Sequence, residues 1–467
     1  MRIVLKNFRI VDEETDMTGQ VLIDEGIITS VLSGQDLSPA LKGEAAMIID
    51  GRSVSHSGNG LPVLMPAFVD LHAHFRDPGF PEKETLESAS LAAVAGGFGT
   101  VVCMANTKPV IDSPEKVRAL KKRSEALALI DLYPVMSLTR GMEGKELSEL
   151  GAILPRPAGD ALAAGWEGPL ALSEDGKDLA DDSLFLAAMG EAKRIGIPIS
   201  CHCDFGGDEA EVAKNAGQPR SMWSRIEENN AVRRVIELGK KAGCHIHIAH
   251  VSTKEAAEMI RRAKAELAGA APNGNRSTGS FKLTCEVMPH NLCLTEEDAR
   301  RLGDESWGRV NPPLHSEEDR KALIRALADG IIDAIATDHA PHSNADKEKG
   351  TPGFSGFETA FAAVCTELVR GGSGKSGPGI DPSIDLKRLS SLMSARPARL
   401  LGLEGGQKRG RIKAGYRADL VMVDTERSWI VDPETFKTRG KNSPFNGREL
   451  FGKILLTINQ GRVVYHS

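Results

Sequence analysis

Short apolar runs alternate with longer amphipathic segments through the middle of the chain. The apolar runs are rich in Val and Ile, and Gly or Pro bounds several of them, which is typical of strands buried on both faces of a parallel sheet. Eight runs are predicted to be strands, at 63–71, 99–105, 129–137, 170–173, 197–201, 244–249, 283–288 and 332–337. Helical patterns lie at 182–194, 225–242, 254–268, 317–328, 357–369 and 386–401.

This order of elements predicts an α/β fold with a parallel sheet. Eight strands favour closure into a (β/α)8 TIM-type barrel, in which the chemistry lies on the loops that follow the strands. A doubly wound open sheet is the alternative architecture.

The two ends of the chain follow a different pattern, because apolar and polar residues alternate with a period of two over 1–33 and 411–464. The segments Asp24-Glu-Gly26 and Asn459-Gln-Gly461 have the composition of hairpin turns. Neither end has enough strands for a core of its own, so we expect both to form one small β-sandwich. The predicted parts are 1–56 and 405–467 for this sandwich and 57–404 for the barrel.

Composition narrows the class of protein. Lys and Arg number 58 against 64 Asp and Glu, a net charge of −6 without a basic tract, which argues against a nucleic-acid partner. No run approaches the roughly 18 apolar residues of a membrane span, and no signal peptide is expected at the N-terminus. The seven cysteines lie mostly in apolar runs and fit reduced, buried thiols, so we expect a cytoplasmic protein.

A metal site is predicted where the strands end. Asp70-Leu-His72-Ala-His74 ends the first run, and residues two apart in a strand point to the same side, so His72 and His74 can bind one metal. Four further candidates follow other runs, namely Asp175, His202, His250 and Asp338. Imidazole and carboxylate ligands suit zinc better than iron or manganese.

Several motifs resemble those of dihydroorotases and occur in that family's order. They are DLHAHFRDPG (70–79), MANTKP (104–109), AHVSTKEA (249–256), CEVMPHNL (285–292), VNPPL (310–314), ATDHAPH (336–342) and GFETAF (356–361). KNSPFNG (441–447) is similar to both dihydroorotases and hydantoinases. The resemblance covers nearly the whole predicted barrel and implies a (β/α)8 barrel with a small β domain from both termini.

The resemblance also implies roles for the candidate ligands. Those that match the family's zinc ligands are His72, His74, His202, His250 and Asp338. Asp175 matches an aspartate that one bacterial class carries in place of a carboxylated lysine, so no carboxylated lysine is expected here. The number of zinc ions stays open at one or two, and the adjacent Glu174 is an alternative ligand.

The substrate site is implied in the same way. Arg76, Asn106 and His342 match residues that hold the substrate carboxylate, and an arginine fork suits that group. The alternative for Arg76 is a surface ion pair with Asp77. Asn311 and the loop 343–356 resemble the segment that closes over the pyrimidine ring.

The activity implied by the resemblance is the reversible hydrolysis of the cyclic amide of (S)-dihydroorotate to N-carbamoyl-L-aspartate, in de novo pyrimidine (UMP) biosynthesis. Metal-activated water attacks, and Asp338 is the general acid and base. A homodimer and an association with aspartate carbamoyltransferase are further expectations from the family. The alternatives are a hydantoinase or allantoinase, which would not need Arg76 with Asn106, and a non-catalytic relative that acts as a scaffold.

Overall fold

A parallel barrel forms the centre of the computed structural model, which describes residues 2–34, 47–54, 60–157, 165–203, 220–269, 281–303, 305–371, 383–405 and 408–467. Its strands are β6 (Phe68–Ala73), β7 (Phe98–Cys103), β8 (Asp131–Pro134), β9 (Leu172–Ser173), β10 (Ile199–Cys201), β11 (His245–Ile248), β12 (Lys282–Val287) and β13 (Ala334–Ile335). Each of the eight predicted runs therefore overlaps a barrel strand.

Two single bridges close the barrel. The strands pair in parallel as β6-β7-β8 and as β9-β10-β11-β12-β13. A parallel bridge between Met136 and Leu172 joins the end of β8 to β9, and another between Ala73 and His339 joins β6 to the chain after β13. The predicted barrel is confirmed, and the open sheet is wrong.

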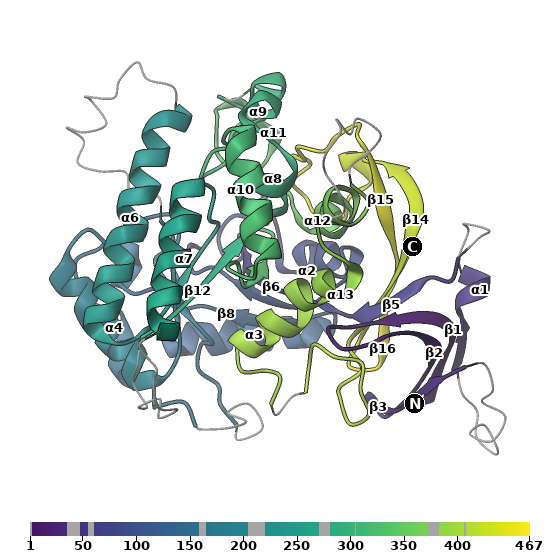
Figure 1. Cartoon of the computed structure of the whole chain (residues 1–467). Coiled ribbons are helices and arrows are strands. Elements are labelled where there is room, and N and C mark those ends of the chain that lie inside the picture. Colours follow the sequence, from purple (N-terminus) through teal and green to yellow (C-terminus); the bar gives the residue numbers. More distant parts are fainter. Residues whose placement is uncertain are drawn as a thin grey trace.

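Helices cover the outside of the barrel (Figure 1). The longer ones are α2 (Leu86–Ala95), α3 (Pro114–Leu127), α4 (Asp182–Ile195), α6 (Arg220–Ala242), α7 (Lys254–Gly269), α10 (Glu317–Ala328) and α12 (Phe357–Val364). Short helices are α1 (Gly51–Val54), α8 (Pro289–Cys293), α9 (Glu296–Leu302), α11 (Asn344–Glu348), α13 (Leu386–Ser390) and α14 (Arg396–Leu400). Side-chain caps fix several starts: Ser316 and Asp319, for example, form a capping box at α10.

Five further helical turns complete these elements. The 3-10 turns are η1 (Arg140–Met142), η2 (Glu149–Ala152) and η5 (Pro433–Thr435), and the π-helical turns are η3 (Cys365–Val369) and η4 (Ser391–Ala395). The π turns continue α12 and separate α13 from α14, so the predicted helices at 357–369 and 386–401 are each built from two kinds of helix. None of the helices among the described residues is both long and apolar enough to cross a membrane.

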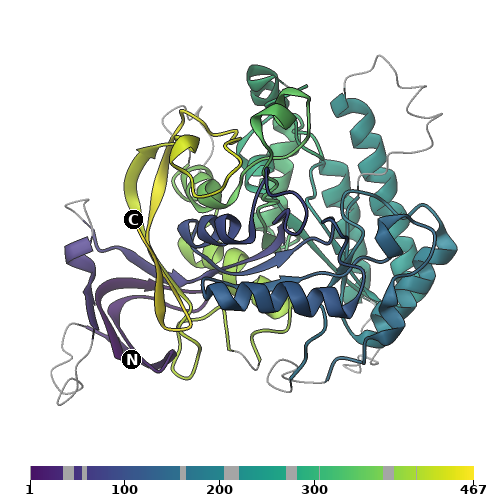
Figure 2. The ribbon, with the colours of Figure 1, turned by 180° about the vertical axis from the view of Figure 1, so that it is seen from behind.

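Both termini build one further β domain, as predicted, and its strands pair in a single sheet. Its strands are β1 (Arg2–Val11), β2 (Asp16–Asp24), β3 (Ile27–Ser33), β4 (Met47–Asp50), β5 (Val63–Pro66), β14 (Leu420–Ile430), β15 (Glu449–Asn459) and β16 (Arg462–His466). They pair in the order β16-β15-β14-β5-β1-β2-β3, with β4 beside β1. The predicted hairpin turns are present, and their central residues Glu25, Gly26, Gln460 and Gly461 all have positive φ. Figure 2 shows this sheet on one side of the barrel, with both chain ends in it.

The apolar run 63–71 holds two strands with different partners. β5 pairs with β1 and β14 in the terminal sheet, whereas β6 begins two residues later and pairs with β7 in the barrel. The terminal sheet is thus joined directly to the strand that carries the histidine pair. The predicted boundary at residue 56 lies outside the described residues.

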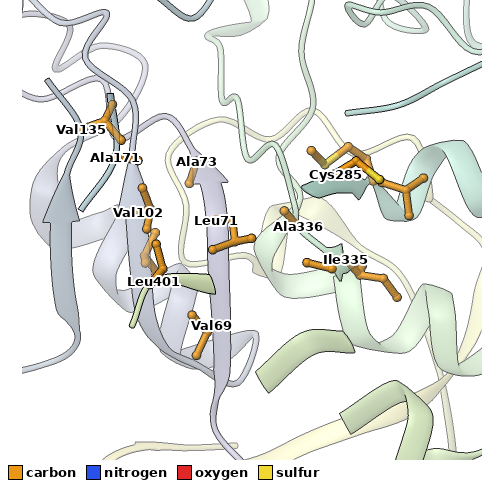
Figure 3. Packing of buried hydrophobic residues seen from close by; sticks show 14 of the residues in the cluster. Val69, Leu71, Ala73, Val102, Val135, Ala171, Cys285, Ile335, Ala336 and Leu401 are labelled. Atoms are coloured by element: carbon orange, nitrogen blue, oxygen red, sulfur yellow. The ribbon is translucent and has the colours of Figure 1, made fainter. Parts of the chain in front are cut away.

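A single large hydrophobic cluster joins the barrel strands to the elements around them. Val102, Val135 and Ala171 come from or next to successive strands, and Leu401, after α14, packs in the same cluster (Figure 3). A second cluster lies within the terminal sheet and combines residues from both ends of the chain, such as Ile3 and Leu456. The C-terminal ends of the barrel strands therefore project from a rigid, close-packed base.

Candidate active site

All ten predicted site residues line one cavity of about 230 Å³ at the C-terminal ends of the barrel strands. They are His72, His74, Arg76, Asn106, Asp175, His202, His250, Asn311, Asp338 and His342. The backbone segment Thr351–Gly353, from the predicted loop 343–356, also lines it. Loops after parallel strands meet at one rim, which explains how residues spread over 270 positions come together.

Asp175 lies between two groups of potential metal ligands. One group is His72, His74 and Asp175, and the other is Asp175, His202 and His250, with the ligand atoms of each group within 4.8 Å of one another. Oδ1 of Asp175 is 3.1 Å from Nε2 of His72 and 3.3 Å from Nδ1 of His202. Oδ2 of Asp175 is 3.4 Å from Nε2 of His74.

Asp338 also lies close to both histidines of the first group. Its Oδ1 lies 3.2 Å from Nε2 of His74 and 3.7 Å from Nε2 of His72. Burial raises the pKa of Asp338, but the hydrogen bond to His74 and the nearby His72 lower it more, so the net pKa lies well below its usual range. Asp338 is therefore ionised and can bind a cation or accept a proton.

The donor set fits a divalent metal. Nε2 of His72 is buried, and its contacts at 3.1 Å with Asp175 and 3.7 Å with Asp338 do not have hydrogen-bond geometry, although a buried ring nitrogen ordinarily has a partner. Nε2 of His250 and Nδ1 of His202 face each other at 2.6 Å. Burial, and then the neighbouring His202 and His72, lower the pKa of His250 to about 3, so its ring is neutral and can donate a lone pair. Imidazole and carboxylate donors in this number suit zinc.

Glu286 of β12 contacts the predicted ligand His72, and the sequence analysis did not identify it. Its Oε1 is 2.9 Å from Nδ1 of His72, and its Oε2 is 3.1 Å from Nε2 of His247. Burial raises the pKa of Glu286, but His247 and His72 lower it to about 2. A carboxylate inside the apolar run 283–288 was the signal that could have revealed it, because a buried charge requires partners.

Glu174 points elsewhere than its neighbour Asp175. Its carboxylate accepts hydrogen bonds from the backbone N–H groups of Leu138 (2.9 Å) and Thr139 (3.0 Å) and from the Thr139 hydroxyl. Of the two adjacent carboxylates, Asp175 alone belongs to the groups of ligand atoms found among the described residues. Glu174 fixes the loop on which Asp175 lies.

Three site residues have a left-handed backbone. The φ angles of Arg76, His250 and Asp338 are 55°, 34° and 45°. Residues with a Cβ seldom adopt this conformation, because it is sterically strained. Such strained residues cluster at functional sites, where the backbone conformation orients a side chain. Each of the three follows a barrel strand and reaches the cavity.

Arg76 and His342 form the other end of the cavity. Nη2 of Arg76 is 3.2 Å from Nε2 of His342, and Nε of Arg76 donates to the carbonyl of Pro341 at 3.4 Å. Asp77 pairs instead with Arg123 at 2.7 Å, so the alternative ion pair between Arg76 and Asp77 is not formed among the described contacts.

Asn106 lies between the two ends. Its Oδ1 is 2.9 Å from Nδ1 of His74, and its Nδ2 donates to Oδ2 of Asp175 at 3.2 Å. The amide therefore orients two of the predicted ligands and also faces the cavity.

Lys347 holds the loop 343–356 against the cavity and was not singled out in the sequence. This lysine is fully buried, and its Nζ donates to the carbonyls of Arg309 (2.9 Å), Thr351 (3.0 Å) and Gly353 (3.0 Å). Burial, and then Arg309, lower its pKa to about 7. A lysine in a charged loop gives no sequence signal of such burial, because exposure is the rule for this residue.

Comparisons with known proteins show the family of the chain. The model of the amidohydrolase family matches residues 63–464. A dihydroorotase from Clostridium botulinum is 36% identical over 465 residues, covering 100% of both chains, and one from Aquifex aeolicus is 34% identical over 476 residues, covering 100% of this chain and 99% of that protein. Among solved structures, an L-hydantoinase from Arthrobacter aurescens has a TM-score of 0.80 at 25% identity and covers 99% of this chain and 96% of its own.

Proposed function

This chain belongs to the amidohydrolase family and, within it, to the dihydroorotases, and we propose that it hydrolyses the cyclic amide of (S)-dihydroorotate reversibly to N-carbamoyl-L-aspartate in pyrimidine biosynthesis. The proposal rests on one observation: the two ends of a single cavity are lined by chemically different groups. One end has the histidine and aspartate groups, and the other has Arg76 with His342. The first suits hydrolysis of an amide, and the second suits a carboxylate.

Zinc is the proposed metal, and two ions per chain are favoured by the two ligand groups that share Asp175. His72, His74 and Asp338 would hold one ion, and His202 and His250 the other, with Asp175 between them. When bound, zinc supplies Lewis acidity that polarises a carbonyl oxygen and lowers the pKa of water toward about 7.

The side chains around this centre carry the remaining steps. The Asp338 carboxylate takes the proton of the attacking water on an Oδ atom and delivers it to the ring nitrogen as the amide bond breaks. Its ionised state and its place beside His74 support this role. In the ring-closing direction, the same carboxylate removes the proton from the carbamoyl nitrogen.

The opposite end of the cavity selects the substrate. Arg76, Asn106 and His342 hold the carboxylate of dihydroorotate, and Asn311 with the backbone of 351–353 lies against the ring. A fixed carboxylate orients the ring amide toward the metal end, which lowers the entropic part of the barrier. Hydantoin and allantoin have no carboxylate for this end, which argues against the hydantoinase alternative.

The scaffold alternative is disfavoured because the chain keeps all six predicted ligands in one cavity. A homodimer and an association with aspartate carbamoyltransferase stay predictions from the family resemblance, as does a cytoplasmic location.

The test is turnover of L-dihydroorotate by zinc-loaded protein, compared with Asp338→Asn. We expect the wild type to be active and the variant to lose about 100-fold or more in kcat, the usual worth of a general acid and base. Zinc content measured on the same samples separates loss of the proton acceptor from loss of metal. Near-normal kcat in Asp338→Asn with zinc bound would contradict the role of Asp338.

A further inference from the structure

Both ring nitrogens of His342 face cationic hydrogen-bond donors. Nε2 lies 3.2 Å from the Arg76 guanidinium, and Nδ1 lies 3.4 Å from Nζ of Lys83. Guanidinium and ammonium groups have no acceptor, so each of these contacts is a hydrogen bond only if the ring nitrogen offers a lone pair.

The imidazole of His342 cannot satisfy both donors. Burial, and then the positive charges of Arg76, Lys83 and Lys347, lower the pKa of His342 to about 2, so the ring is neutral. A neutral ring has one lone pair and one N–H. One of the two contacts therefore brings two N–H groups together, an arrangement that an anionic oxygen between them relieves.

The surroundings of Arg76 and Lys83 indicate which of the two contacts brings two N–H groups together. Arg76 and His342 line the cavity, whereas Lys83 is not among the described residues that line it. Lys83 is 3.6 Å from Asp346 of α11, and its side chain is only 19% exposed, so its ammonium is held beside Nδ1. The cavity, and with it the place for an anion, lies at the Arg76 contact.

We propose that Lys83 is a positioning residue that donates to Nδ1 of His342 and thereby keeps the ring hydrogen on Nε2, where it meets the substrate carboxylate together with Arg76. The inference rests on the proposed function, because it assigns the carboxylate of dihydroorotate to this end of the cavity. In the opposite tautomer, Nε2 accepts from Arg76, and both groups are then less available to the carboxylate.

Lys83→Met tests the proposal, with Lys83→Arg as the conservative variant and Lys240→Met as the control. Lys240 lies near the C-terminal end of α6, outside the cavity, and its side chain is 42% exposed, so its loss removes the same charge. For Lys83→Met we expect KM for L-dihydroorotate to rise about 5- to 20-fold with kcat within about 2-fold, the effect of one lost orienting hydrogen bond. Lys83→Arg recovers most of the KM, and Lys240→Met leaves it unchanged.

A double-variant cycle shows whether Lys83 acts through His342. If it does, Lys83→Met added to His342→Ala causes no further rise in KM, because the partner is already absent. Binding of orotate, measured by calorimetry on the zinc-loaded protein, gives the same comparison without turnover.

Three results would overturn the proposal. These are an unchanged KM and orotate affinity in Lys83→Met, a fall in kcat without a change in KM, or full additivity with His342→Ala. A wild type that neither binds orotate nor turns over dihydroorotate would instead overturn the proposed function, and the inference with it.

Discussion

Glu286 Oε1 lies 2.9 Å from Nδ1 of His72, across a sequence separation of 214 residues. This contact suits an N–H of His72 on Nδ1, so that Nε2, which faces Asp175 and Asp338, would be the atom that binds a metal. A carboxylate behind a ligand histidine fixes its tautomer and increases its basicity. Nε2 of His247 lies 3.1 Å from the other oxygen of Glu286, so each carboxylate oxygen faces an imidazole.

Replacing Glu286 by Gln is expected to weaken metal binding about 10- to 100-fold, because the amide keeps the shape and removes the negative charge. The measurement is zinc affinity by competition with a chelator. Glu318→Gln, which changes a carboxylate that is 70% exposed, is the matched control and should not alter the affinity. An unchanged affinity in Glu286→Gln would show that His72 does not need this partner.

Asp175→Ala is expected to reduce the zinc content from two ions per chain to one or none, because this carboxylate belongs to both ligand groups. Elemental analysis of protein dialysed against zinc measures the stoichiometry. Asp329→Ala, at a carboxylate that is 53% exposed, serves as the control. Two ions retained in Asp175→Ala would contradict the shared position of Asp175.

Lys347→Met should release the loop 343–356 without changing the metal centre. The substitution leaves the carbonyls of Arg309, Thr351 and Gly353 without their common donor. We expect kcat/KM for dihydroorotate to fall about 10- to 100-fold, because the backbone that faces the ring is no longer fixed. Proteolysis within the loop should become faster as well. Lys349→Met is the exposed control, and equal effects of the two substitutions would contradict the account.

Glu358 gives a pH-dependent prediction for stability. Its carboxylate accepts from the backbone N–H groups of Lys437 (2.7 Å) and Thr438 (3.2 Å), and burial raises its pKa from 4.5 to about 7. The pKa of Glu358 is higher in the folded protein than in the unfolded one. The contribution of Glu358 to the free energy of unfolding is therefore fully present below a pH of about 4.5 and is lost as the pH rises through about 7.

Glu358→Gln keeps the accepting oxygen and has no charge to bury. The variant should therefore match the wild type at pH 4 and exceed it by about 1–3 kcal/mol in free energy of unfolding at pH 8. Urea titrations at both pH values measure this. A variant less stable than the wild type at pH 8 would show that the charged form is favoured in the fold.

The sequence predicted the barrel and the cavity-lining residues for a simple reason. A strand buried on both faces is an apolar run, and the residue that follows it reaches the common rim. His202, His250 and Asp338 could therefore be assigned without knowledge of their contacts. The break at Ala67 between β5 and β6 was not predictable, because both strands are apolar and only pairing distinguishes them.

The contacts of the residues that support the site could not be predicted from the sequence. The contact of Glu286 with His72 depends on how distant strands are aligned around the barrel. The burial of Lys347 depends on three carbonyls that only the folded loops bring together. Asn106 was predicted to hold substrate, but its contacts with His74 and Asp175 arise from the relative position of three strand ends.

The most direct test of the account compares kcat/KM for L-dihydroorotate and for hydantoin in the wild type and in Arg76→Gln, both zinc-loaded. We predict that the wild type prefers dihydroorotate, and that Arg76→Gln loses about 100-fold or more on this substrate with little change on hydantoin, because a bidentate carboxylate contact is removed. A wild type that prefers hydantoin, or an Arg76→Gln variant that keeps its activity on dihydroorotate, would contradict the proposed reaction and its carboxylate site.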